Sequence, residues 1–561
     1  MNTDTRRKPV DNHFYDEVEK ITKELVSIES IVKNGSESNV ARYIYDFYQG
    51  LDYFKDNPEL LVFQKTKDDQ VDRHNTICML KGEKENSKET VILMGHIDTV
   101  GVEDFSYIKD YAFSPDNLIE KLKLENLDYI TQKDIQSGDY MFGRGVLDMK
   151  SGVAVQMSIM KYFSENLDKL KGNVIAIAEC DEEGSSHGII SALDILNSWK
   201  IEHELEYIVA INSDFTTPMY EGDKNRYVYL GTVGKLLPSF YIAGVETHVG
   251  KAFGGLDPNM IASEINKNLN LNTNYCDVGQ GETTLPPVCL QLRDLKPEYN
   301  VQTPMAANSF YNYSTHSASP LDVIEKMRIL AKDSVDSVLA YIDKEYKKWC
   351  KLSNSQYSKL EWNVGVYTWN EYEKSLIHEY GGKYIDYIEE FKRNLDLGYP
   401  DMSITDFSLK IIHEAYSKFS KGDDPVVIIY YGSPYYQNVE ILGNDEREIR
   451  IIRSIKEAIT LVSDYSHDKI QLKYFYPYIS DSSFMFMPRE DSGIKSFEEN
   501  FPSWGIKYTH PVKKIRKISM PVINIGTFGN DGHKFTERVH KSYTFETLPK
   551  LILSFLDVLL Q

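Results

Sequence analysis

Four apolar runs of the chain are each followed closely by side chains that bind divalent metal ions. The runs and their polar followers are Val91–Met94 with His96 and Asp98, Val174–Ala178 with Glu182 and Glu183, Ile208–Ile211 with Asp214, and Val522–Ile525 with His533. Runs of this length and composition are typical of buried strands. Because ligands gather at the carboxyl ends of strands in open α/β sheets, the pattern predicts that these imidazoles and carboxylates share one site.

A fifth segment, Gly143–Lys150, places Asp148 just before a predicted helix. Each piece also has an ordinary explanation when it is taken alone. Asp148 is explained by a helix cap, and His533 by a structural role in a glycine-rich loop. An Asp-Glu-Glu turn is typical of a solvated surface, and a His-x-Asp pair is a common polar pair. The prediction of a site therefore depends on the occurrence of all these pieces together at strand ends.

Short apolar runs alternate with helical stretches, which indicates an α/β domain with a mostly parallel sheet flanked by helices. Residues 13–33 and 37–50 have the apolar spacing of helices, and Thr547–Leu560 is predicted as a terminal helix. The predicted domains are 1–233 and 371–561, which form the two parts of a catalytic α/β domain, and 234–370, which is inserted between them.

The inserted segment has its own order of elements. It predicts a strand at Leu236–Ala243, a helix at Pro258–Leu269, strands at Val288–Leu292 and Ser309–Ser314, a helix at Leu321–Lys347 and a strand at Leu360–Thr368. The order strand, helix, strand, strand, helix, strand is the ferredoxin-like arrangement. We therefore expect an α+β ferredoxin-like lid domain.

The charge balance excludes several classes of function. Lys and Arg number 63 and Asp and Glu 84, which gives a net charge of −21. Such an acidic surface repels phosphate backbones and argues against nucleic acid as a partner.

No apolar run approaches the roughly 20 residues that span a bilayer, and the first ten residues lack the apolar stretch of a secretory signal. The five cysteines have no C-x-x-C spacing, so we expect a reducing, cytoplasmic location.

Three of the segments carry a resemblance to a known family. Gly95–Val100, Gly143–Lys150 and Asp181–Ser185 resemble signatures of the dizinc metallopeptidase family that includes aminoacylase, carboxypeptidase G, tripeptidase T and succinyl-diaminopimelate desuccinylase. The motifs follow the family's order and include an inserted lid, which implies a zinc-exopeptidase-like fold. Within the family, the length and the Tyr-rich C-terminal half look most like RocB-type arginine-utilisation proteins.

The resemblance implies a centre that holds two divalent metal ions, Zn²⁺ first, with Mn²⁺ or Co²⁺ as alternatives. Asp148 would bridge both ions. His96 and Asp214 would complete the ligands of one ion. Glu183 and His533 would complete the ligands of the other.

Three catalytic roles also follow from the resemblance. Glu182 is the implied general base, which takes a proton from water and passes it to the leaving amine. Because neighbouring residues at a strand end point in opposite directions, Glu182 and Glu183 are expected to divide the base and ligand roles. Asp98 is expected behind His96, where it fixes the ring orientation. His248 of the lid would reach a partner subunit's site and stabilise the oxyanion, with a surface turn as the alternative.

The predicted substrate pocket departs from the family's pattern. Asn300–Pro304 resembles the lid's Asn–Pro segment, which makes Asn300 a candidate substrate-binding residue. The arginine that would follow it and hold a terminal carboxylate is absent near Tyr313–Thr315. Asp481 replaces part of a Gly-Thr-Asp segment and is either a binding residue or part of a structural turn. The run Tyr430–Tyr436 either lines the pocket or packs in a core or dimer interface.

These residues favour a dizinc-type metallopeptidase or amidohydrolase that cleaves an amide bond in a small peptide or N-acyl amino acid, with arginine-derived substrates suggested by the resemblance. The alternative is a catalytically weakened metal-binding member of the family that acts as a partner or regulator. The presence of Glu182 argues against this alternative, because a protein that only binds metal needs no general base. A third hypothesis is an acidic scaffold without metal. The expected role of His248 predicts a homodimer through the lid. His187 has no family role and is interpreted as a loop residue.

Overall fold

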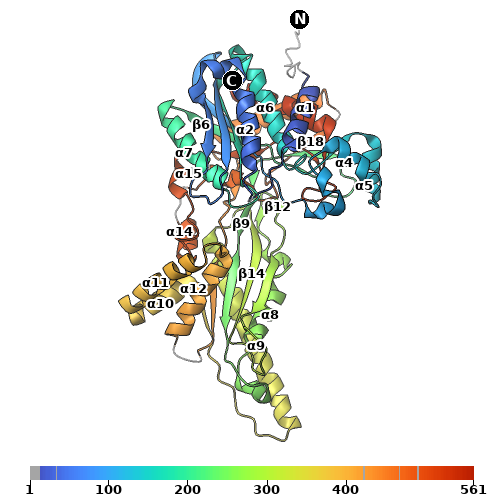
Figure 1. Ribbon diagram of the computed structural model, residues 1–561. Helices are drawn as coiled ribbons and strands as arrows, with labels where there is room; N and C mark the ends of the chain where they lie inside the picture. Colours follow the sequence, from blue (N-terminus) through green and yellow to red (C-terminus); the bar gives the residue numbers. More distant parts are fainter. Residues whose placement is uncertain (1–12, 33, 421–423, 467, 489–491) are drawn as a thin grey trace. The chain divides into compact units, whose positions relative to one another are not determined.

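The computed structural model describes residues 13–561 except 33, 421–423, 467 and 489–491, and Figure 1 shows their helices and strands. The chain forms two compact units, each built from segments that are separate in sequence. Unit 1 consists of Met1–Thr232, Val439–Met487 and Pro511–Gln561, and unit 2 of Val233–Asn438 and Pro488–His510.

An eight-stranded sheet forms the centre of unit 1, in the order β1-β2-β5-β3-β6-β19-β7-β18. Its strands are β1 (Leu61–Lys65), β2 (His74–Lys81), β3 (Glu85–His96), β5 (Lys171–Glu179), β6 (Glu206–Asn212), β7 (Asn225–Tyr229), β18 (Lys469–Lys473) and β19 (Val522–Asn524). The four middle strands, β5, β3, β6 and β19, are parallel to one another. Their carboxyl ends therefore meet at one edge of the sheet. The predicted α/β class is confirmed.

The middle strands are apolar on both faces because both faces are buried. Val91, Ile92, Leu93 and Met94 follow one another in β3 and are at most 1% exposed. Successive side chains of a strand point to opposite faces, so neither face of this part of β3 meets solvent. The main helices of unit 1 are α1 (Tyr15–Ser27), α2 (Glu37–Gln49), α6 (Lys150–Ser164), α7 (His187–Glu202), α13 (Glu446–Ser463) and α16 (Leu548–Leu559).

The first helix is shorter than the predicted 13–33. Helix α1 ends at Ser27, and Ile28 has extended backbone angles (φ −94°, ψ 111°). The Nζ of the buried Lys150 donates to the carbonyls of Leu25 at 3.1 Å and Ile28 at 2.6 Å. The carbonyls at a helix end lack the usual partner four residues on, and this lysine donates to one of them and to the carbonyl of the residue that follows the helix. The contact ties the start of α6 to the end of α1.

Unit 2 is built on a six-stranded sheet whose main path is β13-β14-β10-β16-β15. Its elements are β9 (Gly234–Leu236), β10 (Pro238–Ala243), α8 (Pro258–Leu269), β13 (Val288–Asp294), β14 (Ala306–Thr315), α9 (Pro320–Leu352), β15 (Gly365–Thr368) and β16 (Val426–Tyr431). The predicted ferredoxin-like order is present from β10 to β15. Strand β16 lies between β10 and β15, antiparallel to the first and parallel to the second.

Unit 2 extends beyond the predicted boundary at residue 370 and includes 371–438. Before β16 the chain forms α10 (Trp369–Tyr380), α11 (Gly382–Gly398) and α12 (Ile404–Phe419). These three helices share a hydrophobic core with Tyr241 of β10 and Ile428 of β16. All six residues of β16 are buried. An apolar run of this kind fits a strand of either sheet, so the sequence pattern alone does not tell which sheet β16 joins.

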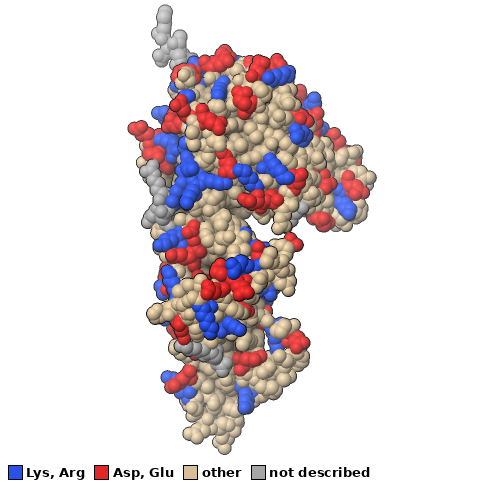
Figure 2. Space-filling model, turned by 60° about the vertical axis from the view of Figure 1, so that its left-hand side comes forward, with Lys and Arg blue, Asp and Glu red and all other residues tan. Residues whose placement is uncertain are grey.

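The other elements are short. They include α3 (Asp52–Asp56), β4 (Tyr140–Phe142), α4 (Pro115–Leu122), α5 (Tyr129–Ser137), β8 (Gly231–Thr232), β11 (Val278–Gly279), β12 (Glu282–Thr283), β17 (Val439–Glu440), α14 (Ser492–Glu499), α15 (Val512–Ile518), β20 (Gly529–Asn530) and β21 (Arg538–His540). Among the described residues, no helix combines the length and apolarity needed to cross a bilayer. Acidic and basic side chains are mixed over the face shown in Figure 2.

Candidate metal centre

Asp148 lies between two histidines in unit 1. Its Oδ1 is 2.9 Å from Nε2 of His96, and its Oδ2 is 2.9 Å from Nε2 of His533. Asp214 forms a group with His96 and Asp148, and Glu183 forms a second group with Asp148 and His533. Within each group one ligand atom per residue lies within 4.8 Å of the others. The structure thus brings the five predicted ligands together in two groups that share Asp148.

Parallel strands place four of these residues at one edge of the sheet. His96 is the last residue of β3, and Asp214 comes two residues after β6. Glu183 lies in a turn after β5, and His533 follows β19 by way of β20. Because β5, β3, β6 and β19 are neighbours in the sheet, their carboxyl ends deliver these side chains to one place.

Asp148 reaches the same place from a loop before α6. The three-stranded sheet β20-β21-β4 connects this loop to the loop that carries His533. Strand β4 precedes the Asp148 loop, and β20 precedes His533. This small sheet therefore links the Asp148 loop to the loop that carries His533.

Glu537 holds the backbone around Asp148. Its Oε1 accepts N–H groups from Gly145, Leu147 and Asp148 at 2.9, 3.1 and 3.3 Å. Its Oε2 accepts Nη1 of Arg144 at 2.6 Å, and both side chains are 1% exposed. Three donors on one carboxylate oxygen fix the loop that carries Asp148. The sequence contains no spacing or motif that points to Glu537, so this residue was not predicted.

Asp98 supports the centre differently from the predicted arrangement. The ring of His96 donates from Nδ1 to the backbone carbonyl of Asp98 at 3.1 Å, while the Asp98 carboxylate is 3.7 Å from that nitrogen. This contact leaves Nε2 of His96 for a metal ion. The Asp98 carboxylate accepts the N–H groups of Glu182 at 3.2 Å and Glu183 at 2.9 Å. One residue therefore orients a metal ligand and holds the backbone of two acidic residues.

Glu182 and Glu183 lie in a turn and not on an extension of β5. The strand ends at Glu179, and the turn covers residues 182–185. Carboxylate oxygens of both residues lie within 4.8 Å of a ring nitrogen of His96 and of each other. The expectation that they point in opposite directions is therefore wrong, because strand alternation does not apply in a turn.

The charges of the side chains at this centre are unbalanced. Hydrogen bonds to Asp148 and Glu183 raise the pKa of His533 to about 10. Burial, followed by the nearby charge of Asp148, raises the pKa of Asp214 to about 7. Burial also raises the pKa of Glu182 well above its ordinary value. More carboxylates are buried here than the two histidines neutralise, and bound cations would take the place of the protons.

The donor atoms fit two divalent ions. Imidazole nitrogens and carboxylate oxygens without a thiolate suit Zn²⁺ and also accept Mn²⁺ or Co²⁺. The two oxygens of Asp148 face different histidines, as a carboxylate that bridges two ions requires. The residues that would hold the ions are His96, Asp148, Glu183, Asp214 and His533.

Asp481 is a buried acid of unit 1. It begins the short helical turn Asp481–Met485 and is 1% exposed. Burial raises its pKa well above the ordinary value, the nearby Ser186 side chain opposes this shift, and the charge of Asp98 adds to it. Its role in substrate binding stays a prediction.

The remaining predicted residues lie in unit 2. His248 and Asn300 are exposed, and Nδ1 of His248 accepts the N–H of Gly250 at 3.0 Å. His248 also forms an isolated β-bridge with Gln302. In the run Tyr430–Tyr436, residues 430, 431 and 435 are at most 3% exposed, which agrees with packing in a core.

The comparisons with known proteins agree with this site. A model of Peptidase family M20/M25/M40 matches residues 92–427. The chain is 37% identical over 536 residues to Protein RocB of Bacillus subtilis (strain 168), covering 95% of this chain and 93% of that protein. It is 31% identical over 553 residues to the uncharacterized protein YqjN of the same organism, with 97% of each covered.

Two solved structures share the fold. The M20 family metallo-carboxypeptidase Sso-CP2 from Sulfolobus solfataricus matches with a TM-score of 0.50 at 12% identity, over 97% of this chain and 99% of that one. A tripeptidase from Staphylococcus aureus matches with a TM-score of 0.50 at 13% identity, over 98% and 99%. The fold and the site define a metal-dependent hydrolase. The chain belongs to peptidase family M20/M25/M40.

Metal binding should release protons. His533 has a pKa of about 10 in the metal-free centre, so at pH 7 it carries a proton that a metal ligand must lose. We expect the affinity for divalent ions to rise with pH above neutrality, measured by calorimetry in two buffers with different ionisation enthalpies. A binding enthalpy that is the same in both buffers would contradict this.

The raised pKa of His533 also affects the stability of the chain without bound ions. It stabilises the fold at pH values below the ordinary pKa of 6.5, and this stabilisation is lost as the pH rises through about 10.

The exchange Glu537→Gln should weaken metal binding. Glutamine keeps the shape of the side chain but loses the charge that pairs with Arg144, so the loop of Asp148 loosens. We expect metal affinity to fall by about 10- to 100-fold, the usual effect of losing a residue that supports a ligand, in a competition titration with a chromogenic chelator. Glu373→Gln in unit 2 is the control. Affinities that match within threefold would show that Glu537 has no such role.

Proposed function

We propose that the chain is a dinuclear amidohydrolase that cleaves an amide bond in a small peptide or an N-acyl amino acid. One observation carries this proposal. The carboxylate of Asp148 is shared by two ligand groups, and Glu182 lies in a further group with His96 and Glu183. A base beside the ligands is needed for hydrolysis and serves no purpose in simple metal storage.

Glu182 is placed to move the proton. Its carboxylate lies among the side chains that would hold the ions, and burial raises its affinity for a proton. It can take a proton from the attacking water and deliver it to the leaving amine. The hydrogen bond from its N–H to Asp98 keeps it in position for both transfers.

The proposed ions are Zn²⁺, because the donors are nitrogen and oxygen atoms of histidine and carboxylate side chains. When bound, two such ions supply an acidified water and polarise the carbonyl of the substrate. The protein's own contribution is to hold the ligands apart in two groups and to keep Glu182 beside them.

For the substrate we propose an arginine-derived amide in amino-acid catabolism. The sequence resemblance to RocB-type arginine-utilisation proteins supports this choice. The absence of arginine in Tyr313–Thr315 of β14 also supports it, because a substrate without a free terminal carboxylate does not need a bidentate clamp there.

The exchange Glu182→Gln should abolish hydrolysis without removing the ions. Glutamine cannot accept the proton, so we expect the turnover number to fall by at least about 100-fold in assays with dipeptides and N-acyl amino acids. Metal content should stay at two ions per chain. Glu202→Gln, on an exposed part of α7, is the matched control. Undiminished hydrolysis would exclude Glu182 as the base, and no turnover by the unaltered chain would favour the weakened, regulatory alternative.

We further propose that the chain forms a homodimer through unit 2. Strand β13 lies at the edge of its sheet, and Val288, Leu290 and Leu292 on it are 37%, 56% and 38% exposed. An edge strand with exposed apolar side chains is a surface for pairing with another chain. In such a dimer His248 would act in the partner's site.

A charge on this strand should prevent association. We expect Leu290→Lys to convert the dimer into a monomer in light scattering and to lower the turnover number together with it, because His248 would lose its partner site. Leu397→Lys, which also alters an exposed leucine of unit 2, should leave both unchanged. A monomer with full activity is incompatible with catalysis across the interface.

A further inference from the structure

A second polar cluster lies behind the turn of Glu182 and Glu183. Arg73, one residue before β2, donates from Nε to Asp69 at 2.8 Å and from Nη1 to Glu37 at 3.1 Å. The same Nη1 donates to Oδ1 of Asp181. The side chains of Arg73, Glu37 and Asp181 are at most 4% exposed. One guanidinium therefore joins three carboxylates from separate parts of unit 1.

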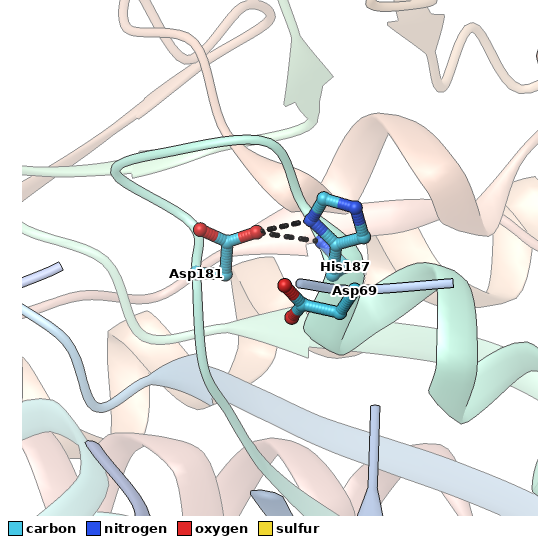
Figure 3. A group of neighbouring side chains, drawn as sticks. All are labelled: Asp69, Asp181 and His187. Carbon is cyan, nitrogen blue, oxygen red and sulfur yellow. Dashed lines mark hydrogen bonds and ion pairs between the residues drawn. The ribbon is translucent and has the colours of Figure 1, made fainter. Parts of the chain in front are cut away.

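His187 completes the cluster from the other side. Oδ2 of Asp181 accepts the backbone N–H of His187 at 3.2 Å and faces its Nδ1 at 2.6 Å. Figure 3 shows the ring of His187 pointing at Asp181, with Asp69 beside it. Hydrogen bonding to Asp181 raises the pKa of His187. Both oxygens of Asp181 are thus engaged, one by Arg73 and one by His187.

The positive charge in this cluster comes from the protein itself. Asp69, Asp181 and His187 place three ligand atoms within 4.8 Å of one another, a grouping that resembles a small metal site. Arg73, however, donates to both of these aspartates. A guanidinium whose N–H groups donate to these carboxylates already provides the positive charge that a metal ion would bring. The cluster is therefore an ion-pair network and not a third metal site.

The network fixes the start and the end of the catalytic turn. Asp181 has a positive φ of 68°, and its carbonyl accepts the N–H groups of Gly184 at 3.3 Å and Ser186 at 2.8 Å. A Cβ on Gly184 would lie 2.2 Å from Oδ1 of Asp181, so the aspartate is folded tightly against the turn. Glu182 and Glu183 occupy the part of the turn between these fixed points.

Asn75 of β2 closes the same turn from the neighbouring position. Its Oδ1 accepts the N–H of Cys180 at 3.1 Å, and its Nδ2 donates to the carbonyl of Gly188 at 2.8 Å. Arg73 and Asn75 are two residues apart, so they lie on one side of the strand. The beginning of β2 thus provides two side chains that hold the turn at both ends.

We propose that Arg73, acting through Asp181 and His187, is the positioning residue that aims Glu182 and Glu183 at the metal centre. The proposal rests on the proposed function, since it concerns the base and one ligand of that site. Removal of Arg73 frees Asp181 from its tight fold, so Glu183 no longer reaches the ion it shares with His533. The ion held by His96 and Asp214 keeps its ligands.

The test is a metal titration of the full chain with Zn²⁺ against a chromogenic chelator, without substrate. We expect Arg73→Met to lower the affinity of one of the two sites by about 10- to 100-fold and to leave the other within threefold. Arg73→Lys keeps the positive charge but lacks the several N–H donors of the guanidinium, so its affinity should lie between those of Arg73→Met and the wild-type chain. Arg42→Met, an exposed arginine that stacks on Phe63, is the control. With saturating Zn²⁺, the turnover number of Arg73→Met should fall while KM stays within threefold.

His187→Ala provides a second variant if Arg73→Met does not fold, because the side chain of His187 is 29% exposed. It should lower the affinity of the same site by a smaller factor. Unchanged affinities in both variants, or an equal loss at both sites, would overturn the proposal while the proposed function stands. Three ions per wild-type chain, one of them lost in His187→Ala, would also overturn it. Fewer than two ions in the wild-type chain would refute the proposed function and this inference together.

Discussion

The centre of unit 1 depends on the fixed position of one carboxylate. Asp148 directs its two oxygens to different histidines, so the orientation of its side chain depends on the backbone that carries it. That backbone belongs to a loop and not to a helix or strand. Glu537 holds the loop by accepting the N–H groups of Gly145, Leu147 and Asp148 with one oxygen. A buried acid that is itself paired with Arg144 thus gives a loop residue the precision that strands give to the other ligands.

The same principle applies to the acidic turn. Two aspartates, Asp98 through its carboxylate and Asp181 through its backbone carbonyl, hold the backbone of the turn, and neither is a predicted ligand. Asp98 accepts the N–H groups of Glu182 and Glu183, while Asp181 is held by Arg73. Burying so many acids is costly unless each one is hydrogen-bonded or paired. The supporting acids meet this condition with protein donors. The acids facing the centre have protein partners for some of their oxygens, such as His96 and His533 for Asp148, and cations would balance the remaining charge.

The resemblance to a known family selected the predicted ligands, and the structure brings their side chains together. Strand ends in a parallel sheet converge, which explains why His96 and Asp214 meet although they follow separate apolar runs. The supporting residues follow no such rule. Arg73 and Glu537 reach the site through the folded chain from positions without any pattern, and no spacing marks them. The turn of Glu182 was misjudged for a local reason, since the positive φ of Asp181 ends the strand geometry that the prediction assumed. The predicted boundary at residue 370 left 371–438 outside unit 2 because an apolar run such as that of β16 carries no information about which sheet it joins.

The place of β16 has a consequence for how the protein is made. Strand β10 pairs with β14 on one side and with β16 on the other. As the ribosome extends the chain, the β14 side can close early, but the opposite edge of β10 stays open until Val426–Tyr431 emerges. The helices α10 to α12 emerge in that interval and can cover one face before the last central strand arrives. Nascent unit 2 therefore passes through a stage with an open apolar edge, and pairing between such distant segments is slow. During that stage the growing chain is most exposed to wrong partners.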